Sequence, residues 1–399
     1  NEASLGESLY QPSVAERAAL AAAGYNGFPA SGETQANTPF PRWRCIANAL
    51  LNDEPNEKCN GLINRTSTRQ SVSGLAAQLE VDRPLGRHAN RFIAGVTVER
   101  SHADFTQSGQ FGYLNADRSI TGVTGPGAFA DGTQASENAF DARVDLHGRT
   151  RNDAVFVADT LALADRWIVS LSARHDRSHT VTRDALVPGG GSGSLDGDHV
   201  FARFNPAAGL VYRASAHTSL TASVTEASRA PSAIELGCAD PANPCRLPNA
   251  MAGDPPLREV VTRTVELGAR GDAGANVSWS AAAFRGDSRD DLLFVADDQA
   301  GFGYFRNFGR TRRQGLELGA MLAHERWTLG ANYTRVEATY RTAETLNGAA
   351  NSASDAIAPG FEGTIAIEPG DRLPLVPRHV AKAFVQWQVL PSLSVDADA

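Results

Sequence analysis

The sequence feature that most constrains the fold is a two-residue alternation of apolar and polar side chains. In the segment WIVSLSARHDRSH, residues 167–179, Trp167, Val169 and Leu171 fall on one side, and Ser170 and Ser172 on the other. The pattern returns near residues 75–81, 92–99, 154–163, 200–212, 219–228, 261–270, 276–295, 315–322, 326–335 and 379–390. Because successive side chains of a strand point to opposite faces, we predict about eleven strands, and a twelfth that begins at Leu393.

The connections between these segments alternate between short and long. Tight turns are expected at 82–88, 164–166, 214–217, 272–275, 323–326 and 390–392. Long loops are expected at 1–65, 109–141, 184–199, 229–260 and 344–373, whereas the connection near 297–303 is short and departs from the rule. Antiparallel strands joined in this way gather the tight turns at one end and the long loops at the other. With strands of about ten residues or more, this is typical of an all-β, antiparallel transmembrane β-barrel with short periplasmic turns and long extracellular loops.

The composition excludes several other classes of protein. Apolar residues make up 42% and charged residues 21% of the chain, so wholesale disorder is not expected. The net charge of −8 argues against a nucleic-acid partner, because such partners are bound through a basic surface. No apolar run reaches the length of roughly 18 residues that a transmembrane helix needs. The best helical segment is residues 14–25, within the first long loop.

Four cysteines form two local pairs in segments rich in Pro, Asn and Asp. The pairs are Cys45 with Cys59 and Cys238 with Cys245, and neither has the C-x-x-C spacing of zinc or redox sites. Four cysteines permit three pairings, of which we favour the local one. We therefore predict two disulfides and an oxidising compartment.

Little in the sequence indicates a catalytic site or a metal site. There is no G-x-S-x-G elbow, so we expect no catalytic residues, no cofactor and no enzyme. His175 and His179 lie on one strand face, where metal ligation is conceivable but solvated side chains are favoured. The acidic pairs at 290–291 and 297–298 could hold calcium, but solvated loop charge is favoured there too, and no metal site is predicted.

Four ordered segments resemble the family of TonB-dependent outer-membrane receptors. RFNPAAGLVYRASAHTSLTASVTEASRAPSAIEL at 203–236 resembles the family's barrel signature, and DPPLREVVTRTVELGARG at 254–271 resembles the element that follows. YFRNFGRTRRQGLELGA at 304–320 and RLPLVPRHVAKAFVQW at 372–387 resemble two later elements. Asp254-Pro255 stands where the family prefers Asn-Pro, and residues 1–199 match only in general character.

The resemblance implies a β-barrel of about 22 strands around an amino-terminal plug domain. Neither a plug nor a TonB-contacting segment is found here, and the chain stops at DADA without the family's terminal aromatic residue. We therefore expect an incomplete barrel of about 11–12 strands, truncated at both ends. Residues 1–65 are assigned to a long extracellular loop region with one disulfide, and residues 66–399 to barrel strands.

Two groups of site residues follow from this reading. The residues of the family motifs are expected to have structural roles, and they are Arg229, Pro231, Glu235, Glu266, Asn307, Gly315, Glu317 and Pro377. Within that group, Arg229 and Glu235 are predicted to form a salt-linked strand exit at the Pro231 turn. Substrate contact is predicted for Tyr25, Arg42, Trp43, Arg44 and His179, because arginine forks beside aromatic rings suit an anionic, aromatic ferric siderophore.

The function implied by the resemblance is energy-coupled uptake of a large, scarce nutrient across the outer membrane of a Gram-negative bacterium. A ferric siderophore is the expected substrate, although importers of cobalamin, glycans and other metal chelates share the same signature. The expected partners are the TonB energy-transducing complex, acting through a plug, and outer-membrane lipid. A passive porin or adhesin-like barrel without TonB coupling is one alternative, and a secreted β-rich enzyme is another.

Overall fold

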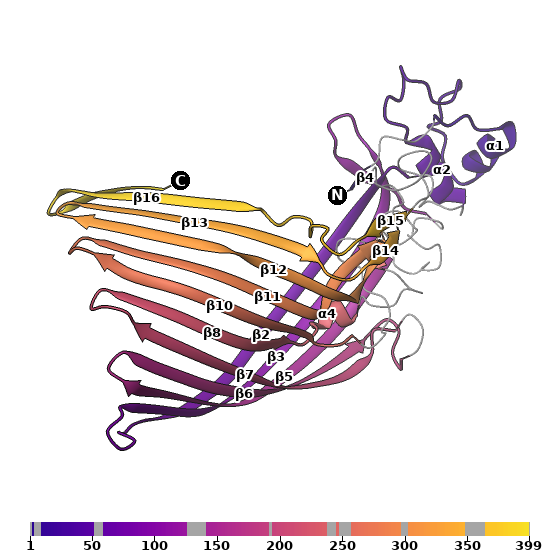
Figure 1. The fold of residues 1–399 in the computed structure, drawn as a ribbon. Coiled ribbons are helices and arrows are strands. Elements are labelled where there is room, and N and C mark those ends of the chain that lie inside the picture. The colour runs from indigo at the N-terminus through magenta and orange to yellow at the C-terminus, as the bar shows by residue number, and fades with distance from the viewer. Residues whose placement is uncertain are drawn as a thin grey trace.

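The computed structural model describes residues 2–3, 9–51, 59–125, 141–190, 194–237, 245–246, 257–296, 302–347 and 364–398. One antiparallel sheet dominates it (Figure 1), in which each long strand pairs with the next one along the chain. Its order is β1 (Glu2–Ala3), β2 (Gly61–Asp82), β3 (Asn90–Leu114), β5 (Asp141–Ala164), β6 (Trp167–Asp184), β7 (Gly197–Arg213), β8 (Thr218–Arg229), β10 (Val260–Ala273), β11 (Val277–Ala296), β12 (Phe302–His324), β13 (Trp327–Tyr340), β16 (His379–Leu390) and β17 (Leu393–Asp398).

Short helices and strands lie at the loop end of this sheet. They are α1 (Val14–Ala22), α2 (Trp43–Leu51), α4 (Ala233–Leu236), β4 (Ile120–Gly122), β9 (Cys245–Arg246), β14 (Glu344–Asn347) and β15 (Thr364–Ile367). The helix predicted at 14–25 is confirmed as α1, which Ser13 and Glu16 begin with reciprocal capping hydrogen bonds. Helix α2 was not predicted. No helix in the described segments is long and apolar enough to span a membrane.

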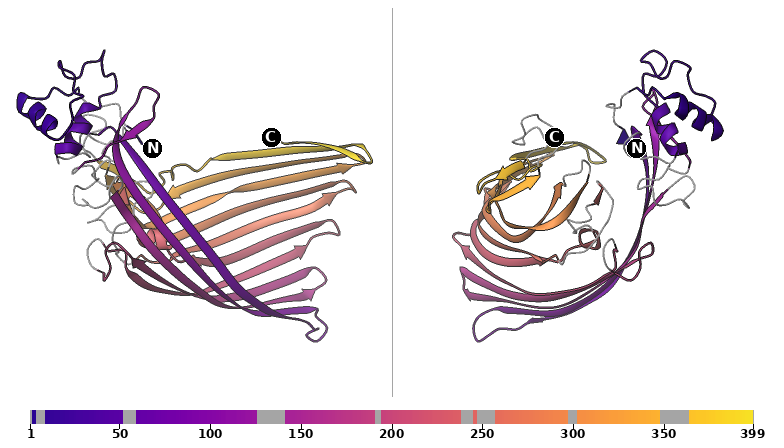
Figure 2. Two further views of the ribbon diagram at one scale, coloured as in Figure 1. Left: turned by 180° about the vertical axis from the view of Figure 1, so that it is seen from behind. Right: turned by 90° about the vertical axis from the view of Figure 1, so that its right-hand side faces the viewer.

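The predicted separation of tight turns from long loops is confirmed. The hairpins β2–β3, β5–β6, β7–β8, β10–β11, β12–β13 and β16–β17 all turn at one end of the sheet. The sheet curves along its width into an open trough (Figure 2), with its two outer strands unpaired with each other. The long strands agree with the prediction of an antiparallel barrel wall.

Several strands continue further toward the loops than the alternation predicted. Strand β2 begins at Gly61 rather than near residue 75, and β3 continues to Leu114. In the added part of β2 the sequence NRTSTRQS is polar on both faces, so it carries no alternation to detect. These residues are nevertheless paired with β3 without a break from Gly61 to Asp82.

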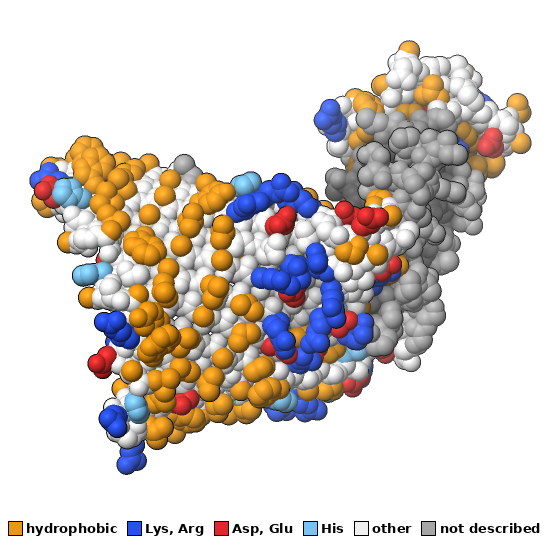
Figure 3. Space-filling model, viewed as in Figure 1, with side chains coloured by type: hydrophobic (Ala, Val, Ile, Leu, Met, Phe, Trp, Pro, Cys, Tyr) orange, Lys and Arg blue, Asp and Glu red, His pale blue; other side chains and the backbone are white. Residues whose placement is uncertain are grey.

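The convex face of the trough carries a broad apolar band (Figure 3). Side chains such as Leu171, Leu267, Leu316 and Leu318 point outward from it and are 48–60% exposed. Close to the tight turns, aromatic rings pair across strands, with ring centroids 4.4 Å apart for Trp167 and Tyr212 and 4.9 Å apart for Trp327 and Trp387. An apolar outer band edged by aromatic rings is the surface that a membrane-spanning barrel presents to lipid.

The concave face allows close approach of neighbouring strands at certain glycines. Gly315 of β12 lies opposite Phe284 of β11, and Gly330 of β13 lies opposite Phe384 of β16. A Cβ atom on Gly315 would lie 2.0 Å from the Arg335 carbonyl oxygen and 3.0 Å from the Phe284 ring. Glycine is therefore required at this position, where the aromatic ring of one strand covers the bare backbone of the next.

Buried apolar residues form small clusters at the loop end instead of one central core. One cluster joins α2 to the start of β2 and to β3, through Ala49, Leu62 and Phe111. Another surrounds Leu236 of α4, and a third surrounds Phe308 and Tyr340. Among the described residues no second layer covers the rest of the sheet, so the loop end is where packing fixes the positions of side chains.

Candidate functional site: the loop end of the barrel wall

The segment from Leu9 to Leu51 folds into a compact unit, here called the N-terminal cap, beyond the loop end of β2. Four of its aromatic rings pack in a row, with centroid distances of 5.6 Å for Tyr10–Phe28, 5.3 Å for Phe28–Trp43 and 5.5 Å for Trp43–Tyr25. The Arg42 guanidinium lies 4.7 Å from the centre of the Trp43 ring. Stacking of cations on aromatic faces adds to the apolar burial that holds this row together.

Glu33 organises the N-terminal cap through three backbone hydrogen bonds. Its side chain is fully buried, and one carboxylate oxygen accepts from the backbone N–H groups of Arg42 at 2.7 Å and Trp43 at 2.6 Å. The other oxygen accepts from the Tyr10 N–H at 2.8 Å. Because the N–H groups at the start of a helix have no partner within it, the negative charge of Glu33 is well placed to begin α2.

The predicted disulfide between Cys45 and Cys59 is confirmed. It links α2 to the residues just before β2, with the two Cα atoms 4.4 Å apart. The loop that it closes has a sequence separation of 14, for which the chain-entropy model predicts a stabilisation of about 3 kcal/mol. The other predicted pair includes Cys238, which lies outside the described residues.

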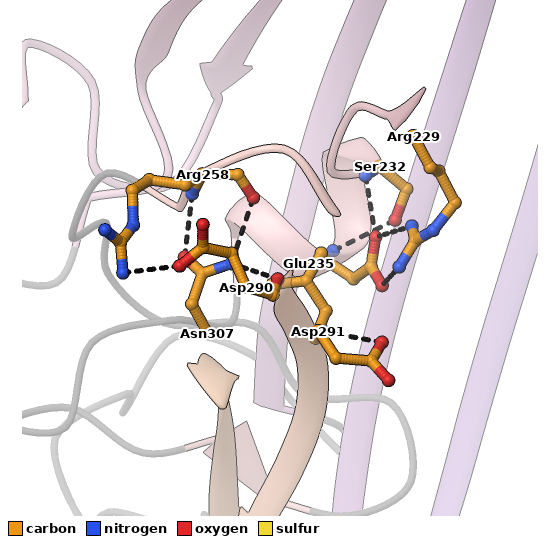
Figure 4. Close-up of polar contacts among 8 residues, drawn as sticks. Arg229, Ser232, Glu235, Arg258, Asp290, Asp291 and Asn307 are labelled. Atoms are coloured by element: carbon orange, nitrogen blue, oxygen red, sulfur yellow. Dashed lines mark hydrogen bonds and ion pairs between the residues drawn. The ribbon is translucent and has the colours of Figure 1, made fainter. Parts of the chain in front are cut away.

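At the exit of β8, Arg229 and Glu235 form the predicted salt link around the Pro231 turn (Figure 4). Two guanidinium nitrogens of Arg229 donate to the two carboxylate oxygens of Glu235, at 2.7 and 3.0 Å. Glu235 also accepts from the Ser232 N–H at 2.8 Å, and the Ser232 hydroxyl caps α4. Burial pushes the pKa of Glu235 upward, but Arg229 and the Ser232 N–H outweigh it and hold that pKa below its ordinary value.

Asn307 of β12 joins the segment just before β10 to β11. Its side-chain oxygen accepts from the Arg258 N–H at 2.7 Å, and its side-chain nitrogen donates to the carbonyl oxygens of Arg258 at 3.0 Å and Asp290 at 2.8 Å. The Arg258 guanidinium pairs with the Asp290 carboxylate at 2.7 Å (Figure 4). Asp290 has φ +53°, so Asn307 supports a bend where the regular pairing of β11 is interrupted.

Loss of the Arg229–Glu235 link is expected to loosen the β8 exit. In a double-mutant cycle with Arg229→Ala and Glu235→Ala, we expect a coupling energy of about 1–2 kcal/mol, reduced from the value for a buried pair because Arg229 is half exposed. Since the folded pKa of Glu235 is lowered, this stability is present above its ordinary pKa of 4.5 and is lost as the pH falls through the lowered value.

The coupling is measured by urea-dependent proteolysis at the β8 exit, at neutral pH and at acidic pH. The matched control is the exposed pair of Arg91 and Glu80 beside a tight turn, whose coupling should be clearly weaker than that of Arg229 and Glu235 because solvent screens it. Equal coupling energies for the two pairs, or a coupling that grows as the pH is lowered, would contradict a stabilising role for the link.

The concave face beside α4 contains a polar chamber of about 770 Å³. Strands β2, β3, β5 and β6 supply hydroxyl, amide and charged side chains to its wall, including Asn152, Arg174 and Asp176. Glu259 lies at its margin, where burial raises the pKa of the carboxyl group. A polar concave surface opposite an apolar convex surface is the arrangement of a barrel with a hydrated interior.

The other predicted site residues are dispersed. His179 lies on the same strand face as Leu171, the convex one, and its Nε2 is 2.7 Å from an Asp198 carboxylate oxygen. It lies on β6, three strands along the sheet from β2, whereas Tyr25, Arg42, Trp43 and Arg44 belong to the N-terminal cap, which packs on β2 and β3. Glu266, Glu317 and Pro377 are exposed, on β10, on β12 and before β16.

The acidic pair at 290–291 is occupied by protein contacts. Asp290 pairs with Arg258, and Asp291 accepts from the Thr311 hydroxyl at 2.6 Å and lies 3.3 Å from the Arg313 guanidinium. In the part of the chain that the structure describes, no group of three or more His, Cys, Asp or Glu side chains is placed to hold a metal ion. The pair at 297–298 lies outside the described residues.

The sheet is an antiparallel meander whose convex face is apolar and whose concave face is polar, and its tight turns are gathered at one end. These features define the wall of an outer-membrane-type β-barrel. The chain belongs to the TonB-dependent receptors, because the family model described as "TonB dependent receptor-like, beta-barrel" matches residues 18–397. Proteins of this family are transporters of the Gram-negative outer membrane.

Individual relatives are more distant. A protein of Acinetobacter baumannii named "Probable TonB-dependent siderophore receptor PiuA" is 23% identical over 261 residues, which is 65% of this chain and 32% of that protein. The crystal structure of PiuA has a TM-score of 0.55 at 17% identity and covers 88% of this chain and 49% of its own. The ferric-catecholate import receptor Fiu of E. coli K12, in its closed form, has the same TM-score and identity and covers 84% and 44%. The chain thus spans half or less of each relative's length, and the structures show a shared fold.

Proposed function

We propose that this chain forms part of the wall and the outer cap of a receptor that imports a ferric siderophore across the outer membrane, coupled to the TonB complex. The observation that carries the proposal is the family match over residues 18–397. The names of the relatives support the substrate class, since PiuA is named as a siderophore receptor and Fiu as a ferric-catecholate import receptor. The orientation that follows places the N-terminal cap outside the cell and the tight turns in the periplasm.

For substrate capture, we propose contact with Arg42 and Arg44 of the N-terminal cap. Trp43 is only 7% exposed and packs between Phe28 and Tyr25, so its role is to position the two neighbouring arginines. The Arg42 guanidinium lies over the rings of both Trp43 and Tyr113. Its buried Nε has no hydrogen-bond partner among the described residues, which favours completion by an acceptor on an incoming anion.

Uptake by cells lacking the gene tests the substrate class. Complementation with the natural gene is expected to restore uptake of a ferric siderophore, but not of cobalamin or a glycan, and only while TonB is present. The variant Arg42→Gln/Arg44→Gln should weaken siderophore binding about tenfold, since it removes charge-assisted contacts.

Arg341→Gln is the matched control, because Arg341 is an exposed arginine at the same end of the sheet. It should leave binding unchanged. Uptake that persists without TonB would favour a passive porin, and uptake of cobalamin or a glycan in place of the iron chelate would overturn the proposed substrate.

A further inference from the structure

The dipeptide Asn-Gly occurs three times in the chain, at residues 26–27, 60–61 and 347–348. It is the asparagine sequence most prone to deamidation, because the glycine nitrogen attacks the side-chain carbonyl carbon of the asparagine and no glycine side chain hinders the approach. The first two sites have opposite environments in the structure, whereas Gly348 lies outside the described residues.

Asn60 is protected from this reaction by the fold. It is only 3% exposed, and its Oδ1 accepts from the Leu114 N–H at 2.9 Å, which fixes the side-chain amide. Gly61 is the first residue of β2 and is paired with both Gly112 and Ala3. Rotation of the Asn60 amide toward the Gly61 nitrogen would break the bond to Leu114 and disturb the end of the strand. Reaction at Asn60 therefore requires local unfolding.

Asn26 and Gly27 have none of these restraints. Both are exposed, in the irregular segment that follows α1 in the N-terminal cap, which stands beyond the loop end of the sheet (Figure 2). Within the described segments, neither the Asn26 side chain nor the Gly27 N–H makes a hydrogen bond. The Asn26 amide can therefore turn toward the Gly27 nitrogen while the rest of the cap keeps its fold.

This dipeptide lies against the aromatic row of the cap. A Cβ atom on Gly27 would be 3.3 Å from the hydroxyl oxygen of Tyr25 and 3.7 Å from the ring of Trp43. The Arg42 guanidinium covers the same Trp43 ring. A chemical change at residues 26–27 is therefore made beside the side chains that we assign to substrate capture.

We propose that Asn26 is a site of spontaneous deamidation that changes the charge of the N-terminal cap. The Gly27 nitrogen bonds to the side-chain carbon of Asn26, and the amide nitrogen leaves as ammonia with the proton of the Gly27 N–H, which closes a succinimide ring. Water then opens the ring, and residue 26 becomes aspartate or isoaspartate with a negative charge. Only water is consumed, so the reaction needs no oxidant and no enzyme.

One added charge is a large change for the cap. Residues 9–51 contain three arginines and two glutamates, a net charge of +1, which deamidation reduces to zero. In the isoaspartate form the backbone also gains a methylene group between Tyr25 and Phe28, two rings of the aromatic row. Both changes are expected to weaken anion capture at Arg42 and Arg44. This consequence rests on the proposed function, whereas the deamidation itself does not.

Ageing of the full chain, extracted from outer membranes in mild detergent, tests the modification. The protein is held at mildly alkaline pH and sampled over days, and peptide mapping by mass spectrometry with isoaspartyl methyltransferase labelling measures conversion at each asparagine. Conversion at Asn26 is expected to be at least about tenfold faster than at Asn60, because Asn60 must first unfold locally. The variant Asn26→Gln should lose the fast conversion, since its longer side chain closes a less favourable ring.

Binding of a ferric tris-catecholate complex measures the consequence for capture. The variant Asn26→Asp introduces the charge without lengthening the backbone, and it should bind the complex about threefold more weakly than the fresh natural protein. Asn276→Asp is the matched control, because it places the same charge in the exposed turn between β10 and β11 and should leave binding unchanged. Aged Asn26→Gln protein should keep the affinity of the fresh protein.

Equal conversion rates at Asn26 and Asn60 would overturn the modification site, and so would isoaspartate formation in Asn26→Gln as fast as in the natural protein. An Asn26→Asp protein that binds the ferric complex as tightly as the natural one would overturn the effect on capture. If the fresh protein binds no ferric complex, the proposed function fails, and the conversion rates still decide whether Asn26 is the modification site.

Discussion

Replacement of Glu33 with alanine is expected to unfold the N-terminal cap while the sheet stays intact. The substitution removes the carboxylate that accepts from the N–H groups of Tyr10, Arg42 and Trp43, of which that of Trp43 is buried, and it removes the negative charge from the start of α2. Each charge-assisted bond to a buried group contributes about 1.5–3 kcal/mol, and after relaxation we expect a loss of about 3–5 kcal/mol from the local stability of the cap. Native-state proteolysis within residues 9–51, followed against urea concentration, measures it.

The Glu33→Gln variant separates geometry from charge. A glutamine keeps one oxygen acceptor, so its loss should be about half that of alanine. Glu80→Ala is the control, because Glu80 makes an exposed ion pair with Arg91 at the tight-turn end, and its loss should leave the stability of the cap unchanged. A Glu33→Ala protein as resistant to proteolysis as the Glu80→Ala protein would show that Glu33 does not organise the cap.

Introduction of a single methyl group at Gly315 is expected to disrupt the central hairpin of the sheet. In Gly315→Ala the new Cβ would lie 2.0 Å from the Arg335 carbonyl oxygen, which belongs to the backbone of the paired strand and cannot rotate away. Relief of this overlap requires β12 and β13 to separate, at a cost of about 3 kcal/mol or more. The folded fraction in the outer membrane, measured by heat-modifiable migration, should fall several-fold.

Gly209→Ala provides the matched control for that experiment. Gly209 is also a strand glycine, on β7, but a Cβ there would meet only the Ser170 Cβ at 4.0 Å. Its stability should change by less than about 1 kcal/mol, because the methyl group enters open space. If both variants assemble equally well, the close approach at Gly315 is not what makes glycine necessary there.

Much of the architecture could be predicted from the sequence because its causes are local. Alternation along one strand depends only on which face meets an apolar environment, so Leu171 and Leu220 indicate the outer face without knowledge of their neighbours. Tight turns are likewise encoded within a few residues, as in the AHER segment at 323–326. The alternation fails at 61–74, where both faces of β2 are polar and only pairing with β3 defines the strand.

Contacts at the loop end could be predicted where the two residues lie close together in the sequence. Arg229 and Glu235 are six residues apart and flank a proline turn, so their salt link could be inferred from the motif. The role of Asn307 could not be worked out in the same way, since its partner Arg258 is 49 residues away. Glu33 gave no signal at all, because nothing in the polar segment around it marks a carboxylate that becomes fully buried.

The sequence by itself determined the strands, the order of turns and loops, the apolar outer face and the family motif, since each depends on spacing within a short stretch of chain. Tertiary structure decided which charges meet. Register across β10 to β13 brings six arginines from four strands to one surface, and the fold of the cap carries Glu33 to the start of α2. Electrostatic and hydrogen-bond energies depend on distance in space, and the chain alone does not specify that distance for residues far apart along it.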